Sequence, residues 1–239
     1  MPDLRATLAA GGPAIGLWAS IPSSLTAEAA AQAGADYVVV DQQHGAVDAS
    51  LMTAMLQAIG GARVPALVRV AQNDPWTIGN VLDLGAAGVI VPMVEDGEQA
   101  ARAVAACRYA PDGIRSFGAL RGGGEAPLCL VMIETRAGLE RAEEIAATPG
   151  LDGVYVGPSD LALTLGLQPT LRLEHPPVLE ALDRVRAACR AAGVAAGVHC
   201  LAAEDVPEQA ARFAIVTAGG DMLYLREALA RALAVARGG

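Results

Sequence analysis

Short runs of β-branched and other apolar residues alternate along this chain with alanine-rich stretches in which apolar residues recur at helical spacing. Few polar residues interrupt the runs, which is typical of parallel strands that are buried on both faces. The expected strands cover residues 14–20, 37–41, 65–70, 88–93, 128–134, 153–157, 194–200 and 213–219. The expected helices cover residues 25–33, 48–59, a segment beginning near 74–75, and 97–107, 137–146, 159–165, 176–192 and 221–237.

Eight successive units of strand and helix favour an α/β fold that closes on itself, a (β/α)₈ TIM barrel. The length of 239 residues suits one such barrel, so we expect a single domain over residues 1–239. The alternative is an open, doubly wound sheet. No G-x-G-x-x-G follows the first expected strand and no G-x-x-x-x-G-K-[ST] occurs anywhere, which disfavours the open sheet.

The one long irregular stretch is 109–127, rich in glycine and proline. We expect it to form a flexible loop over the face where the strands end, because loops of this length are often functional. Arg115 and Ser116 are candidate contacts for an anionic group. Arg121, followed by three glycines at 122–124, is a candidate part of a lid.

Charge and composition narrow the possible partners. The formal net charge is −9 and the pI about 4.8, which disfavours nucleic acid and anionic membrane surfaces. No apolar run reaches transmembrane length and the N-terminus lacks a signal-peptide layout, so a cytoplasmic protein is expected. Its scattered cysteines have no CxxC spacing and are expected to be reduced thiols. All 17 basic residues are arginine, so no side-chain amine can form a Schiff base.

Two carboxylates follow consecutive expected strands. Glu134 closes the strand 128–134, and Asp160 follows the strand 153–157. Strand ends of a parallel barrel converge on one pocket, where two carboxylates repel each other unless a cation lies between them. We therefore expect a divalent cation such as Mg²⁺ at Glu134 and Asp160. The alternative is a helix-capping Asp160 and a salt-bridged Glu134.

An acidic residue and a histidine follow the second expected strand. Asp41 lies three residues before His44, and could orient the imidazole so that its other nitrogen acts as a base. A structural turn histidine is the alternative. Arg69 ends the third expected strand within an apolar run, where it needs an anionic partner or a polarised oxygen. A salt bridge to the carboxylate of a neighbouring strand is equally compatible with that position.

Three further strand ends carry candidates. Gly157, Pro158, Ser159 and Asp160 lead into a helix, whose first backbone N–H groups could hold a substrate carboxylate, although Ser159 or Asp160 could instead cap the helix. Trp18 could line the pocket or simply pack. His199 ends the seventh expected strand and could also face the site.

Taken together, these segments resemble the HpcH/HpaI aldolase family of metal-dependent pyruvate aldolases. The matching pieces are GLWAS, AGADYVVVDQQHG, PALVRV, LDLGAAGVIVPMVE, YAPDGIRSFG, VMIETRAGL and GLDGVYVGPSDLALTLG. They occur in the order found in the family and cover residues from about 14 to 166. The family forms hexamers built as trimers of dimers that exchange the C-terminal helix, which would be 221–237 here.

The resemblance implies a role for each matching residue. Glu134 and Asp160 match the carboxylates that hold Mg²⁺, Mn²⁺ or Co²⁺. His44, paired with Asp41, matches the base that works through a metal-bound water. Arg69 matches the arginine that grips the keto oxygen of the donor. The turn at Gly157, Ser159 and Asp160 matches the carboxylate-binding turn.

One departure is Gln43, where many members have glutamate; we expect it to tune the water network around the metal. The implied reaction is reversible cleavage of a 4-hydroxy-2-oxo acid into pyruvate, or hydroxypyruvate, and an aldehyde. Cleavage releases pyruvate as an enolate, and the metal cation, as electron sink, and Arg69 would stabilise its negative charge. Two alternatives are a CoA-ester lyase of the citramalyl- or malyl-CoA type and a non-catalytic barrel that binds small acids.

Overall fold

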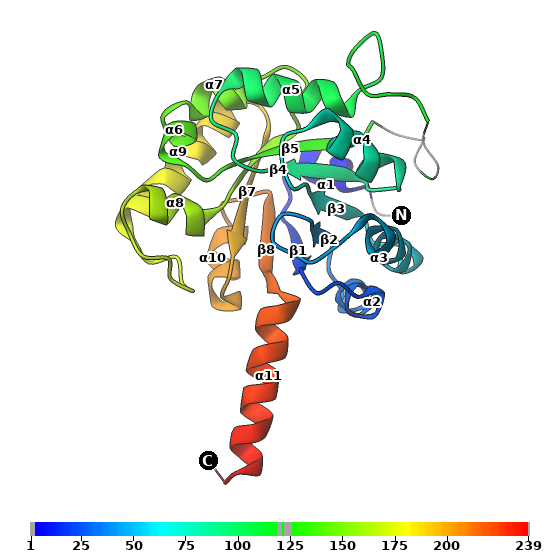
Figure 1. The fold of residues 1–239 in the computed structure, drawn as a ribbon. Helices are drawn as coiled ribbons and strands as arrows, with labels where there is room; N and C mark the ends of the chain where they lie inside the picture. Colours follow the sequence, from blue (N-terminus) through cyan, green and yellow to red (C-terminus); the bar gives the residue numbers. More distant parts are fainter. Residues whose placement is uncertain (1–2, 119–120, 122–125, 239) are drawn as a thin grey trace.

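Eight parallel strands close into a barrel in chain order, as the computed structural model shows for the residues that it describes, 3–118, 121 and 126–238 (Figure 1). The strands are β1 (Ala14–Ala19), β2 (Tyr37–Asp41), β3 (Ala66–Arg69), β4 (Gly88–Val91), β5 (Leu128–Ile133), β6 (Gly153–Val156), β7 (Ala195–Cys200) and β8 (Ile215–Gly220). β8 pairs with β1, so no strand edge is left open. The predicted (β/α)₈ barrel is confirmed.

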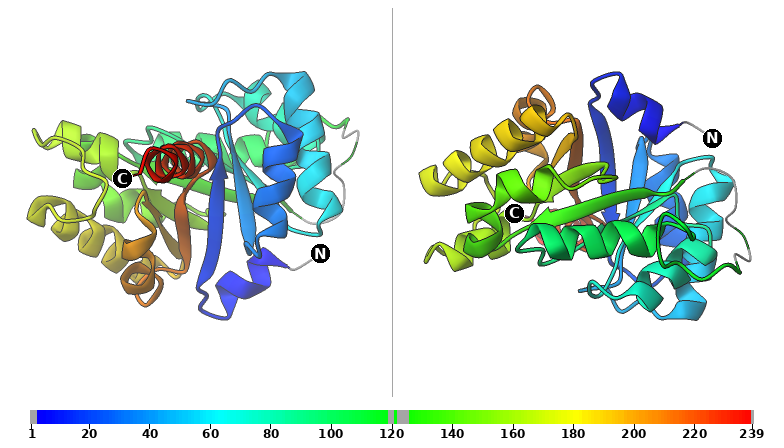
Figure 2. Two further views of the ribbon diagram at one scale, coloured as in Figure 1. Left: turned by 90° about the horizontal axis from the view of Figure 1, so that it is seen from below. Right: turned by 90° about the horizontal axis from the view of Figure 1, so that it is seen from above.

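Helices surround the barrel wall, as Figure 1 and the views from below and above show (Figure 2). They are α1 (Leu4–Ala9), α2 (Ser24–Gln32), α3 (Ala49–Gly61), α4 (Pro75–Asp83), α5 (Gly97–Cys107), α6 (Arg136–Glu140), α7 (Ala142–Ala146), α8 (Pro158–Thr164), α9 (Pro176–Ala192), the 3₁₀ turn η1 (Ala203–Asp205), α10 (Val206–Ala210) and α11 (Asp221–Ala236). Within the described ranges, no helix combines the length and apolarity needed to cross a bilayer.

The differences from the predicted elements have local causes. The helix expected over 137–146 is divided into α6 and α7, because Arg141 between them has the non-helical angles φ −112° and ψ 22°. The short helices α1 and α10 were not predicted, since one or two turns are too few to establish an apolar period. The predicted start of α4 is confirmed: the Asp74 side chain accepts from the Thr77 N–H, and Pro75 occupies the first turn.

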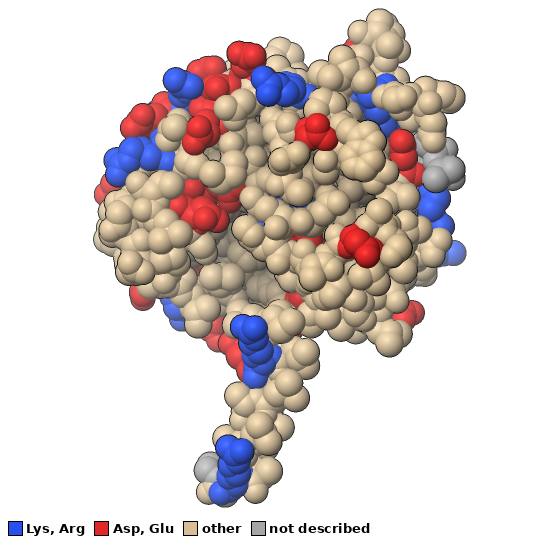
Figure 3. Space-filling model, viewed as in Figure 1, with Lys and Arg blue, Asp and Glu red and all other residues tan. Residues whose placement is uncertain are grey.

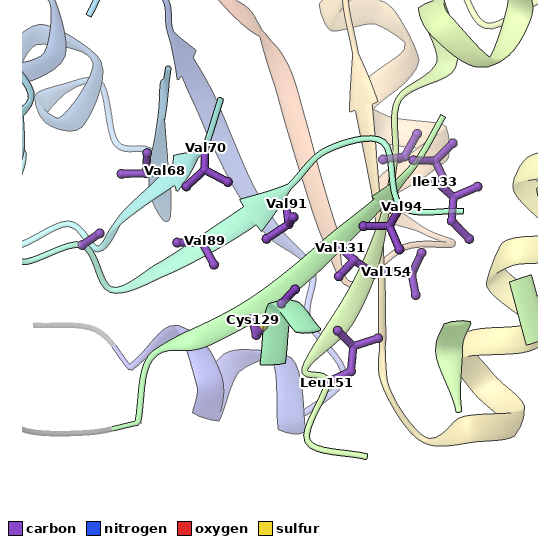
Figure 4. Close-up of a cluster of buried hydrophobic side chains, with 14 of the residues drawn as sticks. Val68, Val70, Val89, Val91, Val94, Cys129, Val131, Ile133, Leu151 and Val154 are labelled. Carbon is purple, nitrogen blue, oxygen red and sulfur yellow. The ribbon is translucent and has the colours of Figure 1, made fainter. Parts of the chain in front are cut away.

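Alternate residues of each strand face the helices or the barrel interior. The outward residues of β3, β4, β5 and β6 are mostly valine, and they pack against the helical layer (Figure 4). The inward residues form a second cluster that includes Tyr37, Leu67, Leu130 and Tyr155. Because both faces are buried, the strands are apolar at nearly every position, and each buried valine or leucine contributes about 1.5–3 kcal/mol.

A hydroxyl cluster fills the middle of the barrel. The Tyr37 hydroxyl lies 2.9 Å from the Thr217 hydroxyl, and Tyr155 hydrogen-bonds to the same group. Two glycines make room for the rings: a Cβ at Gly16 would lie 2.4 Å from Tyr37, and one at Gly197 would lie 2.6 Å from Tyr155. Any pocket at the strand ends therefore rests on a filled interior.

The long connection between α5 and β5 corrects one expectation. Its described residues lie at the N-terminal end of the barrel rather than over the strand ends, because a connection from helix to strand returns to that end. Arg115 bonds to Asp83 at 2.6 Å, and the Arg121 N–H donates to the Asp83 carbonyl. Arg115 thus pairs with a carboxylate at the end opposite the expected site, and the glycines 122–124 lie outside the described residues.

The last helix, α11, projects from the barrel (Figure 1). The Asp221 carboxylate fixes its first turn by accepting the backbone N–H groups of Ser20 and Ile21. None of its side chains is buried, and its exposed apolar residues are Met222, Leu225, Leu229, Leu233 and Val235. The exchange of this helix between subunits stays a prediction.

Candidate active site

The polar candidates form the uppermost inward layer of the barrel. Residues two apart in a strand face the same side, so Asp41 faces inward like Tyr37 and Val39. By the same rule, Arg69 faces inward like Leu67, and Glu134 like Met132. The last positions of the strands therefore converge at one end. A hollow lies beside the start of α11 on the molecular surface, with acidic atoms along one edge (Figure 3).

Arg69 and Asp41 form a bidentate ion pair across neighbouring strands. They are register partners in β3 and β2, and Nε and Nη2 of Arg69 lie 2.9 and 2.6 Å from the two carboxylate oxygens. Both residues are buried. Burial alone would raise the pKa of Asp41, but the hydrogen bonds and charge of Arg69 outweigh it and hold that pKa below its usual value. The salt bridge from Arg69 to the carboxylate of the neighbouring strand is thus present, and its contact with a substrate oxygen stays a prediction.

The expected orientation of His44 by Asp41 is not observed. Asp41 Oδ1 accepts the backbone N–H groups of Gln43 and His44 at 3.1 and 3.3 Å, while its carboxylate faces Arg69. The His44 side chain is exposed and makes no hydrogen bond to any described residue. Asp41 therefore shapes the turn that carries His44 and positions Arg69, because a guanidinium fork pairs more strongly with a carboxylate than one imidazole N–H does.

Trp18 packs between two polar side chains at the end of β1. The Arg69 guanidinium lies 4.9 Å from the Trp18 ring centroid, and the His199 ring lies 4.8 Å away in an edge-on arrangement. Only 5% of Trp18 is exposed. Its indole therefore forms a rigid wall beside Arg69.

Glu134 is a buried carboxylate with one backbone partner among the residues that the structure describes. It is 1% exposed, and its Oε1 accepts the Met93 N–H at 2.8 Å. Met93 has a left-handed φ of 56°, an uncommon conformation for this residue type. Burial raises the pKa of Glu134 to about 7, the Met93 hydrogen bond opposes that shift, and the charge of Asp160 adds to it. Glu134 is therefore short of positive charge.

Asp160 lies in the first turn of α8, directly after β6. The N-cap is Gly157, and no side chain caps the helix, so the alternative of capping by Ser159 or Asp160 is wrong. A Cβ at Gly157 would lie 2.6 Å from Glu134 Oε2, so a glycine is needed for the two segments to approach. Besides burial, the charge of Asp160 contributes to the raised pKa of Glu134, so the two carboxylates influence each other.

The donor set fits a hard divalent cation. Among the described residues no group of three or more His, Cys, Asp or Glu side chains could hold a metal. Glu134 and Asp160 would supply two oxygen ligands, and Mg²⁺ commonly takes one or two carboxylates and fills its other positions with water and substrate. The raised pKa of Glu134 is the local sign that positive charge is lacking there.

A groove at the opposite end of the barrel is not part of this site. Its volume is about 910 Å³, and it is lined by residues such as Pro65, Ala87 and Leu128 at the strand starts. None of the strand-end candidates lines it. In (β/α)₈ enzymes chemistry takes place at the other end, so the polar layer rather than the groove marks the site.

Known proteins resemble this chain over most of its length. A family model described as HpcH/HpaI aldolase/citrate lyase matches residues 14–228. A hydroxypyruvate/pyruvate aldolase from Rhizorhabdus wittichii is 38% identical over 239 residues, which cover 95% of each chain. A 4-hydroxy-2-oxovalerate aldolase from Rhodococcus jostii is 39% identical over 215 residues, or 84% of this chain and 83% of the other.

A solved structure gives the same result. An HpcH/HpaI aldolase/citrate lyase family protein from Burkholderia cenocepacia superposes with a TM-score of 0.90 at 33% identity, covering 99% of this chain and 100% of the other. The family match extends well beyond residue 166, through β7 and β8 into α11. The chain therefore belongs to the HpcH/HpaI aldolase/citrate lyase family, whose aldolases are carbon–carbon lyases.

Proposed function

We propose that this protein is a metal-dependent aldolase that reversibly cleaves a 4-hydroxy-2-oxo acid into pyruvate, or hydroxypyruvate, and an aldehyde. The observation that carries the proposal is the pairing of Glu134, a buried carboxylate short of positive charge, with Asp160 at the strand ends, on the same face as the Asp41–Arg69 pair. The names of relatives 38% and 39% identical to this chain favour the aldolase over a CoA-ester lyase.

Glu134 and Asp160 would hold Mg²⁺, Mn²⁺ or Co²⁺. When bound, the cation would supply positive charge to the keto and carboxylate oxygens of a 2-oxo acid. The backbone N–H groups of Ser159 and Asp160 have no partner within α8, because they lie in its first turn, and they would bind the substrate carboxylate beside Gly157.

Arg69 would stabilise the charge that develops on the keto oxygen as the carbon–carbon bond breaks. Asp41 engages Nε and Nη2, which leaves N–H groups of the same fork for the substrate. The guanidinium is held from below by Asp41 and from the side by Trp18, so it needs little reorganisation during the reaction.

His44 would remove the proton from the 4-hydroxyl group. Its exposed imidazole stands on the turn that Asp41 fixes, next to the strand-end layer. The chain contains no lysine, so a side-chain Schiff base cannot replace the cation as electron sink.

The assembly proposed for this function is a homohexamer in which neighbouring subunits exchange α11. The support is that no side chain of this helix is buried, although several of its residues are large, apolar and exposed.

The test is retro-aldol and aldol activity of the purified protein, with pyruvate or hydroxypyruvate and a panel of aldehydes. EDTA treatment should abolish activity, and Mg²⁺, Mn²⁺ or Co²⁺ should restore it. Full activity after chelation would refute the metal-dependent mechanism. Cleavage of citramalyl-CoA without any aldol reaction would refute the aldolase itself.

A further inference from the structure

His199 belongs to the same inward layer as the residues assigned above, although it has no role in the proposed reaction. It is the last inward position of β7, two residues after Gly197, whose missing side chain makes room for Tyr155. Its register partner on β8 is Thr217, the hydroxyl at the centre of the barrel. The His199 ring therefore lies directly above the filled interior, in the same layer as the strand-end candidates.

The ring has one enclosed nitrogen and one accessible nitrogen. Nδ1 is fully buried and has no hydrogen-bond partner among the described residues. Nε2 is not enclosed, makes no hydrogen bond within the described chain, and belongs to a residue that is half-buried. A buried N–H without a partner is rarer than a buried lone pair without one. This asymmetry favours the tautomer with its proton on Nε2, which presents an N–H donor at the accessible edge.

The charge state of the ring agrees with a neutral donor. Burial, followed by the charge of Arg69, lowers the pKa of His199 to about 4, while the charge of Asp41 opposes the shift. The imidazole is thus uncharged at neutral pH. A neutral N–H donor beside the Trp18 ring can pair with a substrate oxygen without adding charge to the site.

We propose that His199 is a specificity-determining residue whose Nε2–H donates to a hydroxyl oxygen of the substrate, so that hydroxylated substrates are favoured over their deoxy analogues. The inference rests on the proposed function. There the keto and carboxylate oxygens are already assigned to the cation, Arg69 and the α8 turn, which leaves a hydroxyl for His199. A substrate without an oxygen at this position would leave the donor unpaired against an apolar wall.

Two substrate pairs show which hydroxyl is read. Hydroxypyruvate and pyruvate, each with acetaldehyde, differ by the hydroxyl on the donor. Glycolaldehyde and acetaldehyde, each with pyruvate, differ by the hydroxyl on the acceptor. His199→Leu removes both nitrogens, and the matched variant His199→Gln keeps an amide N–H near the position of Nε2.

In the His199→Leu variant, kcat/KM should fall about tenfold or more for the hydroxylated member of one pair, and less than about threefold for its deoxy partner. His199→Gln should recover most of the wild-type preference. The inference is overturned if His199→Leu lowers both members of both pairs equally, as a purely structural role requires, or if it changes neither.

Binding measurements separate this inference from the proposed function. Calorimetric Kd values for hydroxypyruvate and pyruvate are measured with Mg²⁺ present, on wild type, His199→Leu and His199→Gln. If the wild type binds both acids but shows no aldol turnover, the proposed function fails and the ratio of the two Kd values decides the inference. A ratio below about twofold in wild type then overturns the inference for the donor hydroxyl, and a ratio that His199→Leu abolishes supports it.

Discussion

Both ends of the barrel contain a paired arginine and carboxylate. The two ends differ in how much positive charge surrounds their buried carboxylates. At the N-terminal end, Asp152 pairs with Arg5, accepts the Cys129 N–H at 2.7 Å and lies 3.6 Å from Arg108. At the C-terminal end, Asp41 is equally well paired with Arg69, but Glu134 accepts one backbone N–H within the described part of the chain. Both ends are built from the same residue types, so residue type alone does not distinguish structure from function.

The difference lies in what each carboxylate lacks. Two guanidinium groups and a backbone N–H surround the Asp152 carboxylate, so its charge is compensated and its contacts stabilise the fold. At the other end, the pKa of Glu134 is raised by burial and by the charges of Asp160 and Asp41, and lowered by the charge of Arg69. A buried carboxylate without sufficient positive charge costs stability, and such a cost is usually retained at functional sites.

Of the variants at the C-terminal end of the barrel, Glu134→Gln should have the largest effect on activity. The amide keeps the shape of the side chain but cannot neutralise a divalent cation, so aldol kcat/KM should fall about 10³-fold or more. The folded state should be retained, because the variant removes an uncompensated charge. Steady-state kinetics and thermal unfolding measure both effects; near wild-type activity with Mg²⁺ would remove Glu134 from the site.

His44→Ala should lower the retro-aldol kcat by about 10²–10⁴-fold if the imidazole is the base. His175→Ala is the matched control, since that histidine lies in the loop before α9, where its Nε2 lies 2.8 Å from the Gln168 carbonyl oxygen. The control should keep wild-type rates. Equal rates in wild type and His44→Ala would assign the proton transfer to another group.

Arg69→Lys and Arg115→Lys test the same exchange at opposite ends of the barrel. An ammonium cannot pair with Asp41 through two parallel bonds and still face the substrate, so kcat/KM of Arg69→Lys should fall about 10²-fold. Arg115→Lys should keep its activity and lose about 1 kcal/mol of stability, because Arg115 is tied to Asp83. A loss of activity in both variants would point to a general structural effect.

The stability of the metal-free protein should depend on pH through Glu134. Its pKa is raised from 4.5 in the unfolded chain to about 7 in the folded protein, so the folded state binds more protons in that window. The free energy of unfolding should therefore fall as pH rises from about 4.5 to 7, by about 3 kcal/mol at most. Urea unfolding with EDTA at pH 5 and 7.5 measures this, and Glu134→Gln should flatten the difference. Parallel pH profiles in both proteins would contradict the assignment.

Much of the fold could be predicted from the sequence, because the determinants are local. The strand at 37–41 and the helices at 97–107 and 176–192 have the predicted bounds. In each case an apolar period is bounded by residues that favour helix or strand ends, such as the Asp96 side chain that caps α5. Strands buried on both faces are also uniformly apolar, which made the closed parallel barrel recognisable.

The partners of the polar residues depended on tertiary structure. The sequence alone placed Asp41, Arg69, Glu134 and Asp160 at strand ends, since alternation along a strand fixes which residues share a face. Only the register of β2 against β3 showed that the Asp41 carboxylate pairs with Arg69 rather than with the His44 imidazole. Only the packing around Glu134 raised its pKa, and only the direction of the chain between α5 and β5 placed Arg115 at the far end. Periodicity is a property of neighbours in the chain, whereas ion pairing and burial depend on residues that folding brings together from distant segments.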